Sequence, residues 1–111
     1  MPHYMLMFVG DESRRADRPK EETDRGLAAV GKWWQDNGSV IKEGERLDLS
    51  RTATTVRRVN GAMKVFDGPF IESKEQVGGY ALVEVPDLDA AIRLAKSWPM
   101  GDVEVRPTVE H

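Results

Sequence analysis

The amino-acid sequence predicts an α+β domain in which two helices cover one face of an antiparallel sheet. Apolar residues recur at helical spacing in two segments, and short apolar or β-branched runs lie before, between and after them. The chain has 111 residues, which is the length of one domain, so residues 1–111 are taken as a single unit.

The strands are predicted from apolar runs and β propensity. Residues 4–9 are apolar at both parities, which is typical of a strand covered on both faces. Residues 80–85 form the strongest run, a weaker strand is expected at 40–47, and alternating valines predict a closing strand at 103–109.

Two amphipathic helices are predicted between these strands. The first covers about 20–37 and is followed by Gly38, which can take the left-handed conformation that ends a helix. The second follows Asp87, a favourable N-cap, and ends before Pro99. Residues 14–20 are highly charged and are expected to form an exposed loop.

A hairpin is predicted in the middle of the chain. The Thr- and Val-rich strand 52–59 is followed by Asn60-Gly61, a type I′ turn signal, and by a returning strand at 63–66. After the hairpin, residues 71–77 are expected to make one short helical turn.

This order of elements corresponds to a ferredoxin-like α+β fold. Two helices cover only one face of the sheet, although the strands at 4–9 and 80–85 are apolar on both faces. The second face therefore needs a partner, and the simplest partner is a second copy related by a two-fold axis. We predict a homodimer joined sheet to sheet.

Composition and charge exclude several kinds of function. The net charge of −3 leaves no basic footprint, which argues against nucleic acid as the partner. The absence of cysteine excludes thiolate nucleophiles, disulfides and cysteine-ligated metals. No cluster has metal-ligand spacing, and we expect no cofactor. No apolar run could span a membrane and the first residues read as a strand, so a cytoplasmic location is expected.

The most specific motif runs from Asp67 to Tyr80 and reads DGPFIESKEQVGGY. It resembles the signature of the DGPF proteins, which belong to the YCII-related superfamily. Further segments agree with that family at residues 4–12, 52–57, 85–91 and 103–107, so the resemblance covers nearly the whole chain. The resemblance implies a ferredoxin-like fold that dimerises as an α/β barrel.

The resemblance does not imply one particular activity. Most members of the family have no established biochemical function, some relatives act on chlorinated aromatic breakdown products, and DGPF proteins are often associated with extracytoplasmic-function sigma factors. Many relatives carry a histidine–aspartate pair that is proposed as the catalytic element. Here the histidines are His3 and His111, which lie outside the first helix and the strand after it, so that pair cannot be carried over.

Asp67 is the candidate catalytic residue, as a general base or ligand contact at the edge of a cleft. The structural alternative is that its carboxylate caps the turn. In that alternative Gly68 takes a conformation that other residues avoid, Pro69 fixes φ and Phe70 fills the core. Asp67 fits either role, and the structural role is preferred for the other three residues.

Three residues after this turn are candidate substrate-binding groups. Lys74 either lies beside Asp67 and binds an anionic substrate or belongs to a solvated face. Gly78 and Gly79 either present exposed N–H groups to an anion or form a bulge where the strand begins.

Tyr4 and Tyr80 are also candidate substrate-binding residues, because their hydroxyls could bond a phenolic or carboxylate ligand, although strand aromatics usually belong to the core. The three tryptophans are expected on helices and in the core, and His3 as an exposed terminal residue. Arg57 and Arg58 alternate on one strand, so one of them must pair with a carboxylate or line an interface or pocket.

The sequence is compatible with three kinds of function. The favoured one is a dimer that binds a small anionic or phenolic molecule, as a cofactor-free lyase or isomerase would. The alternative is a non-catalytic ligand-sensing or regulatory module associated with a sigma factor. The third is an oligomeric structural protein without a ligand.

Overall fold

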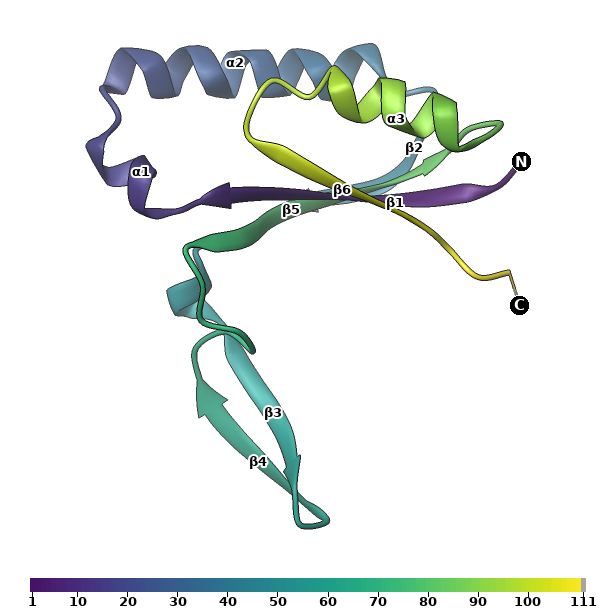
Figure 1. The fold of residues 1–111 in the computed structure, drawn as a ribbon. Helices are drawn as coiled ribbons and strands as arrows, with labels where there is room; N and C mark the ends of the chain where they lie inside the picture. Colours follow the sequence, from purple (N-terminus) through teal and green to yellow (C-terminus); the bar gives the residue numbers. More distant parts are fainter. Residues whose placement is uncertain (111) are drawn as a thin grey trace.

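The computed structural model describes residues 1–110, without the side chains of residues 15 and 16, so His111 lies outside the described residues. Figure 1 shows the arrangement of the elements. In chain order they are β1 (His3–Asp11), α1 (Ser13–Asp17), α2 (Lys20–Asp36), β2 (Ile41–Arg46), the 3-10 turn η1 (Ser50–Thr52), β3 (Thr54–Val59), β4 (Ala62–Asp67), β5 (Glu75–Glu84), α3 (Leu88–Lys96) and β6 (Asp102–Pro107).

Four strands form one antiparallel sheet in the order β2-β5-β1-β6, with β5 and β1 at its centre. Helices α2 and α3 lie on the same face of this sheet (Figure 1). With α1 and the β3–β4 hairpin set aside, the chain runs β-α-β-β-α-β, the element order of a ferredoxin-like fold. The predicted α+β class, with two helices on one face of an antiparallel sheet, is confirmed.

The core lies between the sheet and these two helices. From β1 the alternate residues Tyr4, Leu6 and Phe8 are buried there, and Leu6 and Val83 are completely enclosed. Complete burial of a side chain of this size contributes roughly 1.5–3 kcal/mol. Trp33 is the buried residue of α2, so the core joins the centre of the sheet to that helix.

The opposite side of the sheet, which we call the open face, carries the alternate residues of the central strands, those that do not face the core. Met5 is opposite Leu82 and Met7 is opposite Tyr80, and all four side chains are half-buried. Charged residues flank this apolar stripe on both edge strands, with Glu43 and Glu45 on β2 and Glu104 and Arg106 on β6. The central strands are therefore apolar at both parities, as their sequence indicates.

The hairpin of β3 and β4 forms a second, two-stranded sheet of its own. Its turn has positive φ at both Asn60 (51°) and Gly61 (83°), as a type I′ turn requires, so the predicted hairpin is confirmed. The hairpin extends away from the main sheet on the side opposite α2 and α3 (Figure 1). We call residues 54–67 the arm.

Two local predictions are wrong. The loop expected at 14–20 contains the short helix α1 and the first residue of α2. The helical turn expected at 71–77 is absent, because this part of the described chain is irregular up to Ser73 and β5 begins at Glu75. The Gln76 amide donates to the carbonyls of Ile71 and Ser73, which satisfies these backbone groups without a helix.

Candidate ligand-binding site

A pocket of about 720 Å³ opens between α2, the end of β1, the start of β5 and the segment after α3. Its apolar wall combines side chains from these elements: Phe8, Leu27, Val30, Trp34, Trp98 and Met100. A charged rim surrounds this wall. Its basic residues are Arg14, Arg18, Arg46 and Lys74, and its acidic residues are Asp11, Glu12, Glu45, Asp48, Glu75 and Asp102. The volume falls within the range of small-molecule sites, and an apolar wall with a few polar groups is their usual composition.

Four aromatic rings form a packed cluster beneath the pocket. Phe8 stacks on Trp98, with ring centroids 3.7 Å apart and an interplanar angle of 10°. Trp33 meets Phe8 and Trp98 edge-on, at centroid distances of 5.6 and 5.0 Å. Trp34 completes the cluster at 6.0 Å from Phe8. The prediction that the tryptophans pack in the core is confirmed, because Trp33 is buried there and Trp34 and Trp98 are half-buried against it. Trp34 and Trp98 also line the pocket.

The two indole N–H groups of this cluster have different surroundings. Trp33 Nε1 donates to Ser97 Oγ at 2.9 Å. Trp98 Nε1 is buried and has no hydrogen-bond partner within the described part of the chain. A buried donor without an acceptor is costly, and Trp98 is one of the residues that line the pocket, so this group is a candidate ligand contact.

Two glycines allow the strands to approach the cluster closely. A Cβ on Gly44 would lie 2.5 Å from Trp34 Cη2, and a Cβ on Gly79 would lie 2.9 Å from the carbonyl oxygen of Glu45. The register between β1 and β5 shifts beside Gly78, which leaves this residue in a bulge. The bulge considered for Gly78 and Gly79 is thus present, and both residues also line the pocket.

Two carboxylates of the rim, those of Asp11 and Glu12, accept hydrogen bonds from other residues of the protein. Asp11 accepts from the hydroxyl and the backbone N–H of Ser13, and these bonds, with the charges of Arg14 and Lys74, hold its pKa below the usual range. Glu12 accepts at both carboxylate oxygens, from Ser50 N at 2.8 Å and from Ser50 Oγ at 2.6 Å. These two carboxylates are therefore engaged before any ligand arrives.

The structure separates the residues of the DGPF motif. Lys74 lines the pocket near Asp11, together with Gly78 and Gly79. Asp67 is exposed at the end of β4 and is not among the residues that line this pocket.

The two tyrosines also lie away from the pocket. Tyr4 is buried in the core and Tyr80 lies on the open face, so they occupy opposite sides of the sheet. Their strands are central neighbours, as predicted, but Tyr80 follows five residues of β5 rather than starting it.

The hydrogen bonds that close the turn after Asp67 do not involve the Asp67 carboxylate. Gly68 N donates to Ala53 O at 2.7 Å, and Thr55 Oγ1 donates to Gly68 O at 2.7 Å. Gly68 has φ of 105°, so the prediction that it takes a conformation others avoid is confirmed. The prediction that Phe70 fills the core is wrong, because Phe70 is 62% exposed and carries the Arg57 guanidinium 4.1 Å from its ring centre.

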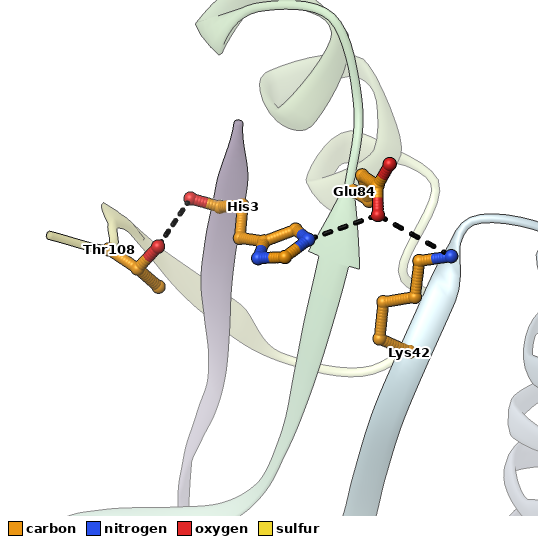
Figure 2. A network of polar contacts seen from close by, with 4 residues as sticks. All are labelled: His3, Lys42, Glu84 and Thr108. Carbon is orange, nitrogen blue, oxygen red and sulfur yellow. Dashed lines mark hydrogen bonds and ion pairs between the residues drawn. The ribbon is translucent and has the colours of Figure 1, made fainter. Parts of the chain in front are cut away.

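His3 takes part in an ion-pair network rather than standing alone at the terminus (Figure 2). His3 Nε2 lies 3.0 Å from Glu84 Oε2, and Lys42 Nζ lies 3.4 Å from the same oxygen. The hydrogen bond from His3, assisted by the charge of Lys42, lowers the pKa of Glu84 although partial burial opposes this shift. The network bridges β1, β5 and β2, and none of its three residues is among those that line the pocket.

Sequence reasoning did not identify the apolar wall. Trp98 was expected to extend a helix, but α3 ends at Lys96 and the indole packs against Phe8. A usable signal was present in Gly44, since a glycine within a strand indicates the close approach of another group.

Within residues 1–110, no group of three or more metal-binding side chains lies together. No helix in that range is both long and apolar enough to cross a membrane.

Comparison with known proteins identifies the family of the chain. The YCII-related domain matches residues 4–110. An uncharacterized protein of Rhizobium meliloti (strain 1021) is 34% identical over 112 residues, which covers 94% of this chain and 90% of that protein. The chain therefore belongs to the YCII-related family.

Proposed function

We propose that the protein binds a small phenolic or anionic molecule in the pocket beside Trp98. The observation that carries the proposal is that Trp98 lines the pocket while its buried Nε1–H has no hydrogen-bond partner among the described residues. A ligand with an acceptor oxygen on a compact apolar body would complement both features.

The size and lining of the pocket support a ligand with one or two rings. About 720 Å³ lies within the usual range for small-molecule sites. Leu27 and Val30 on α2 face the same space as Trp34, so an aromatic ring could bury its surface against them.

Two basic groups of the rim, Arg46 and Lys74, support an acceptor or a negative charge on that ligand. Arg46 and Lys74 form no ion pair with a described residue, whereas Asp11 and Glu12 already accept hydrogen bonds from Ser13 and Ser50. A carboxylate or phenolate oxygen near Trp98 would therefore find donors among the uncommitted groups.

The lowered pKa of Asp11 supports a role in binding more than a role in proton transfer for this carboxylate. A general base works best when its pKa lies near the working pH. The pKa of Asp11 is instead held below its ordinary value by Ser13, so this carboxylate is a weak base. Asp67, the residue proposed from the sequence for lyase or isomerase chemistry, lies outside this pocket.

The test uses para-hydroxybenzoate as the probe and toluene as an apolar match without an acceptor. Trp98→Phe keeps an aromatic ring on Phe8 but removes the N–H donor. We expect the affinity for para-hydroxybenzoate, measured by calorimetry, to fall at least roughly tenfold, since a hydrogen bond to a charged group contributes about 1.5–3 kcal/mol. Toluene binding should be unchanged.

Trp33→Phe is the matched control, because its N–H donates to Ser97 and not to the pocket. This variant should bind the probe like the wild type. Equal affinity of Trp98→Phe and wild type for para-hydroxybenzoate, or no binding by the wild type, would contradict the proposal.

We further propose that two chains pack their open faces together, as a dimeric α/β barrel. Support comes from the half-buried apolar stripe of Met5, Met7, Tyr80 and Leu82, which is bordered by charged edge residues. An apolar centre with a polar rim is the usual anatomy of a protein interface.

Sedimentation of the full chain over a concentration series tests this assembly. The wild type should sediment as a dimer, and Leu82→Glu should shift it to the monomer because a carboxylate would be buried in the apolar stripe. Leu88→Glu is the control, since Leu88 is exposed on α3. A monomeric wild type, or a dimeric Leu82→Glu variant, would overturn this assembly.

A further inference from the structure

We infer that the arm, residues 54–67, packs against the acidic β2 edge of a second copy of this chain. The inference rests on the proposed face-to-face dimer and adds a separate contact to it. Four observations on the arm and on that edge support it.

The apolar side chains of the arm are exposed in the described part of the chain. Val56, Met63, Val65 and Phe66 are 51, 55, 68 and 46% exposed. β3 and β4 pair with each other and with no further strand among the described residues. An isolated two-stranded ribbon is marginally stable in water at best, so these side chains call for a surface outside the chain.

The arm also concentrates positive charge. It carries Arg57, Arg58 and Lys64 against a single acidic residue, Asp67. Arg57 pairs directly opposite Lys64 across the two strands, and like charges in that position are destabilising. An external anionic group beside them would relieve this repulsion.

The β2 edge of the open face supplies such groups. Glu43 is opposite Leu82 and Glu45 is opposite Tyr80, so both carboxylates border the apolar stripe. Both residues are exposed, and neither forms an ion pair with a described residue. On the β6 edge Glu104 is already paired with Arg106, which makes the β2 edge the stronger candidate.

The arm lies on the correct side and is long enough. It extends from the sheet on the side of the open face (Figure 1). Its strands have six residues each, which corresponds to about 20 Å at ~3.3 Å per residue. Packed sheets are only ~10 Å apart, so the arm can pass the sheet of a facing copy.

The experiment exchanges charges between the two surfaces. One variant carries Arg57→Glu and Lys64→Glu, which lie on the same face of the arm, and the other carries Glu43→Arg and Glu45→Arg on the edge. In each homodimer the arm and edge would then have the same sign, and we expect the dimer dissociation constant to rise at least roughly tenfold. In the mixture both contacts regain opposite signs, so heterodimers should form with nearly wild-type affinity.

Native mass spectrometry of the full chains separates the three dimers, and far-UV circular dichroism verifies that each variant is folded. The matched control is Lys20→Glu with Arg25→Glu, the same charge change on α2, which should dimerise like wild type. Arm and edge variants that dimerise like wild type, or a mixture without preferred heterodimers, would overturn the arm contact. In those outcomes the response of Leu82→Glu still reports separately on the face-to-face dimer.

Discussion

Phe8 and Trp98 stack face to face, with 3.7 Å between ring centroids, although they are 90 positions apart in the sequence. Phe8 belongs to the central strand β1, and Trp98 follows α3. The pair therefore joins the sheet to the segment that leads into β6. Both rings also line the pocket, so core stability and the shape of the candidate site depend on the same contact.

Phe8→Ala should lower the free energy of unfolding by about 3–5 kcal/mol, because Phe8 is 6% exposed and touches three indole rings. Urea denaturation at one protein concentration measures this loss. Val109→Ala is the control, since Val109 is 77% exposed and its truncation should change stability by no more than about 0.5 kcal/mol. A loss below about 1 kcal/mol for Phe8→Ala would argue that the stack is unimportant.

Gly44→Ala should destabilise the protein by roughly 1–3 kcal/mol, since the new methyl group would overlap the Trp34 ring and the carbonyl oxygen of Tyr80. Gly31→Ala should have the opposite effect. Gly31 lies inside α2, and a methyl group added there would meet no atom of another element within 4 Å, so alanine should add about 0.5–1 kcal/mol through helix propensity. Thermal unfolding of both variants provides the comparison, and equal changes would refute the packing argument.

Asp87→Ala should cost about 1 kcal/mol of stability, because the Asp87 carboxylate accepts from Ala90 N at 2.9 Å and caps α3. Asp87→Asn keeps an acceptor at this position and should remain within a few tenths of a kcal/mol of wild type. Chemical denaturation distinguishes the two variants. Similar losses for alanine and asparagine would show that the cap does not act through this hydrogen bond.

The lowered pKa of Glu84 predicts how the stability of the protein depends on pH. Its pKa in the folded protein is held below the ordinary value of 4.5, chiefly by the hydrogen bond from His3. The carboxylate therefore contributes stability above that ordinary value, and the contribution is lost as the pH falls through the lowered folded-state pKa.

Glu84→Gln should remove this contribution. The difference in unfolding free energy between wild type and variant should be present at neutral pH and shrink in acid, as urea midpoints along a pH series would show. Both partners are partly exposed, at 42% for His3 and 27% for Glu84, so the effect should be small and should weaken with added salt. A difference that grows in acid would contradict the assigned sign.

Much of the fold could be predicted because its signals are local. The first helix was expected at about 20–37 and covers Lys20–Asp36, since apolar spacing and a terminal glycine act over a few residues. Asn60-Gly61 predicted the hairpin for the same reason, because only the turn geometry has to be satisfied.

The candidate site was predicted only in part. Lys74, Gly78 and Gly79 were named from the motif and line the pocket, but Asp67 from the same motif does not. An extended chain advances by about 3.3 Å per residue, so the two ends of a contiguous motif can lie far apart and need not form one site.

The sequence by itself determined where helices, the hairpin turn and apolar strands occur, because these depend on spacing and backbone preference within short segments. Tertiary structure alone decided that Trp98 reaches Phe8, that the arm leaves the main sheet, and that Glu84 meets His3 and Lys42. These contacts join residues far apart in the chain, and their partners are selected by packing of the whole domain, which no local pattern records.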